Sequence, residues 1–237
     1  MMRNLLATIN FLTVFGRFSD DPFAPERVGR GALYFPFVGL LLGAILALIN
    51  RFFEPYLESE ILGVALITIL ILFTGGSHLE EIRKIFSPSA KSDGVRQTGM
   101  DMNLYGFLAV MLIVLFKIRS VEVIGELRKV ALILTPVLAR WALVIFLYGS
   151  TTSMEDLTRR ISDRVPAWHL LFTTAVTLGL TIFLMGTKGL WLALSVSLFA
   201  LLWRAYLNRY TRELTLSHCG SLIELTETLS FVLFATL

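Results

Sequence analysis

Eight apolar runs, separated by shorter polar segments, constrain this chain more than any other feature. The runs lack the alternation of membrane barrel strands, and backbone polar groups in lipid must be satisfied internally, so we interpret them as helices. We therefore predict an all-α integral membrane protein, a polytopic bundle of about six or seven transmembrane helices. The shorter runs either extend through their polar flanks, or are tilted or partly re-entrant. The runs cover residues 5–15, 32–49, 61–73, 104–116, 130–148, 168–185, 190–206 and 222–237.

Composition supports a bilayer as the solvent. The chain is 55% hydrophobic and only 16% charged, whereas soluble domains carry about 25% charged residues. The net charge of +3 predicts no nucleic-acid partner, because the bases lie between apolar runs, where they face membrane lipid. Cys219 is the single cysteine, which excludes an internal disulfide. No linker is visible, so residues 1–237 are expected to form a single integral membrane domain, multi-pass in the cell (inner or plasma) membrane.

The basic residues divide unevenly between alternate loops. Simple alternation places thirteen on one side, in segments 16–31, 75–103, 150–167 and 204–220. It places six on the other, at Arg51, in segment 117–129 and at Lys188. The positive-inside rule makes the first side cytoplasmic. Segment 117–129, with its four bases, is the one exception to this pattern.

The polar segment 74–106 is the first candidate site. Gly75 and Gly76 open it, and His78, Glu80 and Glu81 follow at once. A chain that concentrates its polar residues in one place usually does its chemistry there. The His and the two acids are candidates for holding Mg²⁺ or positioning phosphate, and a solvated loop start is the alternative.

Charged residues also fall inside two apolar runs. Arg140, in TPVLARWALVIF, costs about 2.5–3.5 kcal/mol to insert, and it either pairs with a buried acid or contacts phosphate. Glu224 and Glu227 lie three residues apart on one helical face. They either pair with Arg140 or Arg204, or they act in metal ligation or general base chemistry.

Two further patterns concern helix packing. Gly39 and Gly43 form a small-xxx-small pair, which is typical of a helix packing face. Pro136 is expected to free a carbonyl and open its helix four residues before Arg140.

Six segments, in order along nearly the whole chain, resemble the cobalamin synthase (adenosylcobinamide-GDP ribazoletransferase) family. They are NFLTVF, GALYFPFVGLLLGAILAL, FTGGSHLE, LYGFLAVML, ALILTPVLARWALVI and IELTETLSFVLF. The resemblance implies a multi-helix membrane transferase of cobalamin biosynthesis. Its substrates would be adenosylcobinamide-GDP and α-ribazole or its 5′-phosphate, its products adenosylcobalamin (phosphate) and GMP, and its cofactor Mg²⁺.

The resemblance also suggests roles for individual residues. His78, Glu80 and Glu224 are the expected catalytic residues, and Glu80, Glu81 and Glu227 the expected metal ligands. The expected substrate-binding residues are Arg140, Lys84, Gly75 and Gly76. A homo-oligomer is compatible with the sequence, which does not decide the oligomeric state.

The chain departs from the family in the acidic run after the histidine, which has the form HLDGLADTADG in the family. Of its three Asp positions, the first falls on Glu80, the second on Lys84 and the third on Ser87. Either Asp93 or Asp101 stands in, or the metal has been lost and Lys84 supplies part of its charge to a phosphate. IELTE keeps Glu224 and Glu227 but has Ile223 in place of Asn.

Two main hypotheses follow. In the first, the chain is a divergent cobalamin synthase that catalyses the transfer. In the second, it is a catalytically degenerate paralogue that binds a corrinoid or serves as a partner subunit. A small transporter ranks last, because no inverted repeat is visible.

Overall fold

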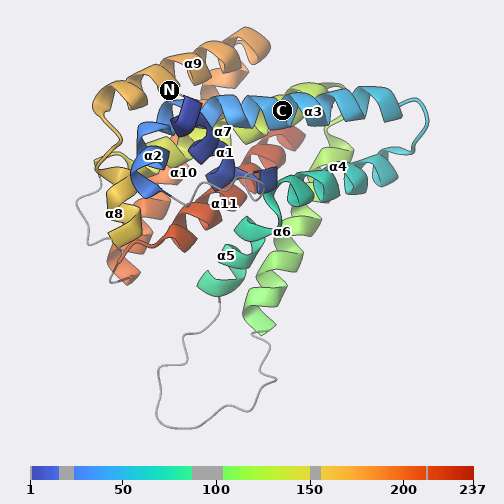
Figure 1. Cartoon of the computed structure of the whole chain (residues 1–237). Helices are drawn as coiled ribbons and strands as arrows, with labels where there is room; N and C mark the ends of the chain where they lie inside the picture. Colours follow the sequence, from blue (N-terminus) through green and yellow to red (C-terminus); the bar gives the residue numbers. More distant parts are fainter. Residues whose placement is uncertain (1, 16–23, 87–103, 150–155, 212) are drawn as a thin grey trace.

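The computed structural model describes residues 2–15, 24–86, 104–149, 156–211 and 213–237, which form helices and no extended strand. Figure 1 shows the arrangement of these helices in the whole chain. The helices are α1 (Met2–Leu12), α2 (Pro25–Arg30), η2 (Ala32–Tyr34), α3 (Phe35–Phe53), α4 (Ser59–Thr74), α5 (Ser77–Ile85), α6 (Leu104–Val123), η3 (Gly125–Leu127), α7 (Arg128–Leu147), α8 (Asp156–Ser162), α9 (Ala167–Met185), α10 (Thr187–Tyr210) and α11 (Leu216–Thr236).

Six helices of the described chain are long and apolar enough to cross a membrane. These six candidate spans are built on α3, α6, α7, α9, α10 and α11. The bent pair α4–α5 provides a seventh crossing if its two helices form one broken span. Six or seven candidate crossings, all helical, confirm the prediction of a polytopic all-α membrane protein. The outward faces of α9 and α10 remain apolar, since Leu171, Phe183 and Trp191 are 70–85% exposed. Lipid is the solvent that such faces require.

The centre of the bundle is α7. Buried residues make up 83% of the most apolar 18-residue stretch of its span, against 22–28% of the same stretch in α6, α9 and α10. Helix α3 crosses it at close range, because Gly39 and Gly43 have no Cβ. A Cβ on Gly39 would collide with the Pro136 carbonyl, and one on Gly43 would lie 2.6 Å from the Ile133 carbonyl oxygen. The predicted packing role of this glycine pair is therefore confirmed.

Pro136 leaves α7 continuous from Arg128 to Leu147. It cannot donate to the carbonyl four residues back, which belongs to Leu132. That carbonyl oxygen lies 2.7 Å from where a Gly43 Cβ would be, so it faces the α3 contact. The expected opening of the helix is absent, and the backbone of α3 covers the site instead.

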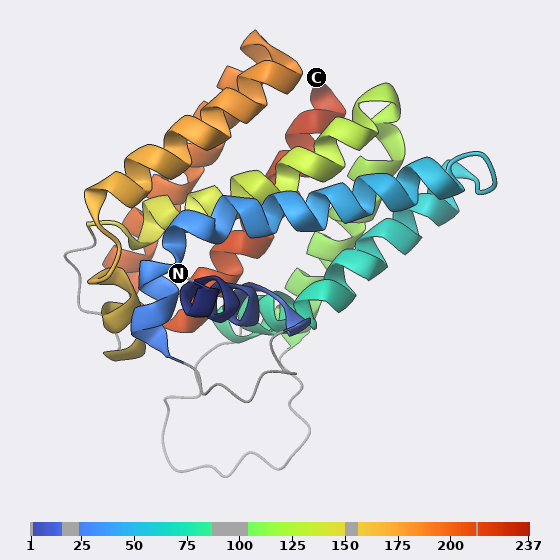
Figure 2. The same cartoon turned by 45° about the horizontal axis from the view of Figure 1, so that its top comes forward.

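The short helices gather at one end of the bundle. In Figure 2, α1, α2, α5 and α8 lie together at this end, while the α3–α4 turn and the C-terminus lie at the other. Antiparallel crossings explain this arrangement, because α2 precedes one crossing and α5 and α8 each follow another. The alternate-loop pattern of the sequence is thereby reproduced in space.

The exception in segment 117–129 is corrected by the structure. Residues 117–123 continue α6, and Lys117 and Arg128 are buried at 1% and 7% exposure. Arg128 donates through Nε to the Val121 carbonyl and through Nη2 to the Glu122 carbonyl, both at 3.0 Å. Removing these two from the six leaves four bases on the sparser side, so the charge asymmetry behind the topology is sharper than the sequence indicated.

We expect Gly43→Ala to destabilise the protein, because the new Cβ meets backbone rather than a movable side chain. The cost should be about 1–3 kcal/mol, as for other overpacked sites. Gly179→Ala in α9 is the matched control, since nothing lies within 4 Å of its Cβ position. Thermal unfolding in detergent measures both, and equal midpoints for the two variants would contradict the close α3–α7 contact.

Candidate functional site in the polar core

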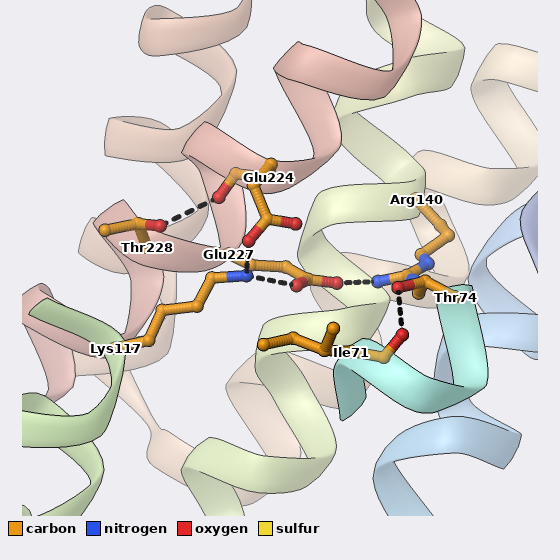
Figure 3. A network of polar contacts seen from close by, with 7 residues as sticks. All are labelled: Ile71, Thr74, Lys117, Arg140, Glu224, Glu227 and Thr228. Carbon is orange, nitrogen blue, oxygen red and sulfur yellow. Dashed lines mark hydrogen bonds and ion pairs between the residues drawn. The ribbon is translucent and has the colours of Figure 1, made fainter. Parts of the chain in front are cut away.

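Four charged side chains from three helices meet inside the bundle (Figure 3). Lys117 comes from α6, Arg140 from α7, and Glu224 and Glu227 from α11. All four are at most 3% exposed. Lys117 Nζ pairs with Glu224 and lies 2.8 Å from Glu227 Oε2, while Arg140 Nη1 pairs with the other oxygen of Glu227. Two buried cations thus neutralise two buried carboxylates, which makes their burial tolerable.

Helix α11 itself presents the two acids to their partners. Glu224 and Glu227 share one face of α11 because they are three residues apart. Thr228 Oγ1 donates to the Glu224 carbonyl at 2.9 Å, a bond within α11. Of the two alternatives for an ion pair, the one with Arg140 is confirmed. Arg204 instead donates to the Tyr148 carbonyl at 2.8 Å, near the end of α7.

His78 joins the same region from α5. It is 5% exposed, and the charges that act on its ring come from Arg140, Glu227 and Lys117. Its Nδ1 lies 3.3 Å from where a Gly220 Cβ would be, so the absent side chain of Gly220 lets α5 approach α11. The structure therefore brings His78, Arg140, Glu224 and Glu227 together, as a shared site requires.

Several buried polar atoms in this region have no hydrogen-bond partner among the described residues. They are Nε and Nη2 of Arg140 and Nε2 of His78. A buried polar group without a partner costs free energy, about 1–3 kcal/mol or more for a charged group. Such a cost is explained if these atoms bind a ligand that carries oxygens.

The double glycine shapes this end of the bundle. Gly75 and Gly76 have φ angles of 63° and 65°, a left-handed conformation that glycine adopts without steric cost. The Gly76 amide donates to the Ile71 carbonyl at 3.0 Å, which ends α4. The chain then turns by 87° into α5. The two glycines thereby place His78 against α11, and their predicted contact with substrate stays a prediction.

Two predicted residues lie elsewhere on α5. Glu80 is exposed, and both of its oxygens accept hydrogen bonds from Arg83 at 2.7 Å. These bonds lower the pKa of Glu80. Lys84 is half-exposed and pairs with Glu81 at 3.1 Å. The structure does not bring Glu80 or Lys84 to the four buried charges, so their predicted roles gain no support from position.

Glu81 is partly exposed, with one carboxylate oxygen at the surface of α5 and the other buried toward α11. Its Oε1 accepts from Lys84, whereas its Oε2 is buried and has no partner among the described residues. Its Cγ lies 2.8 Å from where a Gly220 Cβ would be, so Glu81 and His78 both border Gly220. One carboxylate oxygen is thus available on the side of α5 that faces α11.

The described residues alone do not fit a Mg²⁺ site. Across the described ranges, no group of three or more His, Cys, Asp or Glu side chains is arranged to hold a metal ion. The two buried glutamates are already engaged by Lys117 and Arg140. Ser87, at the third Asp position of the family, and the possible stand-ins Asp93 and Asp101 lie outside the described residues.

Most of the chain, including the polar core, matches a known protein family. The sequence model described as Cobalamin-5-phosphate synthase matches residues 4–81 and 100–235. The chain belongs to this family. The matched ranges contain all four buried charges and His78, and they leave out residues 82–99, where the acidic run departs from the family pattern.

Curated relatives agree over their whole length. An adenosylcobinamide-GDP ribazoletransferase of Alkaliphilus metalliredigens is 27% identical over 244 residues, which cover 99% of this chain and 96% of the relative. Enzymes of the same name from Pseudomonas paraeruginosa and Syntrophobacter fumaroxidans are 29% and 28% identical, and each match covers 93–95% of both chains. No solved structure matches this chain significantly.

Lys117 is the site residue that sequence reasoning missed. The apolar run of residues 104–116 ends just before it, which predicts that the lysine begins a loop. A run of residues 104–116 is too short to cross about 30 Å of hydrocarbon, which takes about 20 residues. Extending the helix until it spans the membrane, as α6 does from Leu104 to Val123, brings Lys117 inside.

We expect Lys117→Met to destabilise the protein by about 3–5 kcal/mol, the usual cost of leaving a buried charge unpaired. Glu224 would then lack its cation. The double variant Lys117→Met/Glu224→Gln should recover most of this loss, because the uncompensated charge is removed. Denaturant unfolding of the four proteins measures the coupling, and a double variant whose loss is the sum of the single losses would contradict it.

Proposed function

We propose that this protein is an adenosylcobinamide-GDP ribazoletransferase in the cytoplasmic (inner or plasma) membrane. It would join adenosylcobinamide-GDP to α-ribazole or its 5′-phosphate and release GMP. The observation that carries the proposal is the set of unpartnered buried polar atoms on Arg140 and His78, in a chain that matches ribazoletransferases over nearly its whole length. The alternative of a degenerate paralogue is not favoured, since every described residue of the polar core lies in the matched ranges.

The chemistry follows from the products. A hydroxyl of the ribazole attacks the phosphorus that carries the cobinamide, and the bond from that phosphorus to the oxygen of GMP breaks. Negative charge develops on the transferring and leaving oxygens, and positioned cations stabilise it. Arg140 would contact the pyrophosphate through Nε and Nη2, the two guanidinium nitrogens that have no partner among the described residues.

The other residues of the core have supporting roles in this proposal. His78 Nε2, buried and unpartnered, would accept the proton of the attacking hydroxyl. Glu227 would hold the Arg140 guanidinium in place through the nitrogen that it already binds, and Lys117 would fix Glu224 and Glu227. Each of these roles uses either a contact between described residues or a buried atom that has no hydrogen-bond partner among them.

We also propose that Mg²⁺ is required, because it would neutralise the charge of the diphosphate as GMP leaves. Among the described residues, Glu81 Oε2 is the one buried carboxylate oxygen without a hydrogen-bond partner. Mg²⁺ usually binds one or two carboxylates together with substrate phosphates. The roles given above to Arg140 and His78 do not depend on the ion.

The transfer itself can be measured directly. We expect the purified full-length protein in lipid vesicles to release GMP from adenosylcobinamide-GDP only when α-ribazole is present. We also expect it to restore growth of a strain that lacks cobalamin synthase. Absence of both effects, with the protein folded in the membrane, would contradict the proposed function and favour the paralogue.

We expect Arg140→Lys to lower kcat/KM by on the order of 10², a typical loss for one transition-state donor. Lysine keeps the charge that pairs with Glu227 but removes the planar fork that binds phosphate. Arg119→Lys on α6 is the matched control, because that arginine is exposed and pairs with Glu122 at the surface. A kcat/KM within threefold of the wild type for both variants would remove Arg140 from the reaction.

A further inference from the structure

A cavity lies at the end of the bundle where the short helices gather. Its volume is about 600 Å³, and it opens between the chain that leads into α3 and the chain that leads into α9. Arg30, Tyr34, Arg164, Trp168 and His169 contribute to its lining. None of these residues belongs to the buried network around Lys117, so the cavity is separate from the site described above.

Two arginines give this cavity a positive charge. Arg30 ends α2, Arg164 follows α8, and both are exposed. Within the described residues, neither forms an ion pair. Glu26 is the acid whose field reaches Arg164, but its Oε1 already accepts a hydrogen bond from Arg160 Nε at 2.6 Å. Among the described residues, neither of these two cavity-lining arginines is paired with a carboxylate.

His169 adds a buried polar atom to the same wall. The residue is 3% exposed, and its Nδ1 has no hydrogen-bond partner among the described residues. Its ring is held by Trp168, whose ring centroid lies 4.1 Å away in an edge-on arrangement. A buried ring nitrogen without a partner is costly unless something binds it. His169 therefore contributes to the cavity wall a ring whose Nδ1 has no partner among the described residues.

Apart from the polar Asn4, the rest of the lining is apolar or aromatic. Trp168 is 56% exposed, and Tyr34 is half-buried beside it in the cavity wall. Aromatic side chains at a membrane boundary present an apolar body with a polar edge. A small inorganic anion would use the arginines alone and leave this surface uncovered. The lining therefore suits a molecule with both a charged group and an apolar or aromatic body.

We propose that this cavity binds a phosphate ester with an apolar or aromatic body, held by Arg30, Arg164 and His169. Guanidinium groups bind phosphate through paired hydrogen bonds, and two of them match a group that carries one or two negative charges. The same chemistry is offered by the headgroup of an anionic phospholipid and by a soluble aromatic phosphate. The proposal concerns a site outside the polar core and does not depend on the ribazoletransferase activity.

The test uses the full-length protein in detergent with two probes. Native mass spectrometry measures the binding of phosphatidylglycerol, with phosphatidylcholine as the zwitterionic reference. Calorimetry measures the binding of phenyl phosphate, with benzyl alcohol as the uncharged reference. We expect at least one phosphate probe to bind at least tenfold more tightly than its reference. Binding of phosphatidylglycerol alone identifies a lipid headgroup as the occupant, and binding of phenyl phosphate alone identifies a soluble ester.

Variants assign the binding to this cavity. Arg30→Gln/Arg164→Gln and, separately, His169→Phe should each weaken the bound probe at least tenfold. Arg51→Gln is the control, since that arginine is exposed near the end of α3, far along the helix from Tyr34. The proposal is overturned if neither probe exceeds its reference in the wild type, a result that needs no variant to fold. It is also overturned if both variants bind like the wild type.

Discussion

The pairing of two buried acids with two buried bases organises this protein. Glu224 and Glu227 on α11 meet Lys117 from α6 and Arg140 from α7, so one network fixes three helices relative to one another. An ion pair of this kind is weak evidence for stability, because desolvation offsets much of the attraction. Its clearer effect is on register, since a shift of any one helix by a turn would separate charges that have no other partner in the described bundle.

The same network explains how a site can exist in an apolar interior. Arg140 uses one nitrogen to bind Glu227, and its remaining nitrogens have no partner among the described residues. A guanidinium that is anchored on one side and open on the other is already oriented before a ligand arrives. Preorganisation of this kind reduces the cost of binding, because the side chain loses little further freedom.

Much of the fold could be predicted from the sequence, because apolar length is a strong signal. A close helix contact at Gly39 and Gly43 was also predictable from their spacing, whereas only the structure identifies α7 as the partner. The site was only partly predictable. His78, Arg140, Glu224 and Glu227 stood out as polar residues near or within apolar runs, whereas Lys117 was lost at a helix boundary. Glu80 and Lys84 were singled out by alignment to an acidic run, and alignment does not say which face of α5 a side chain occupies.

The glycine turn after α4 has a consequence for the membrane itself. With sixteen residues, α4 is about 24 Å long, less than the roughly 30 Å of hydrocarbon in a bilayer. The chain then turns by 87° into a helix that carries Glu80, Arg83 and Lys84. Ionised side chains require water or headgroups nearby, so we expect a bilayer around this bundle to be thinner beside α4 and α5. The polar part of an amphipathic molecule would then reach the bundle interior from water at this point, while its apolar part stays among the surrounding acyl chains.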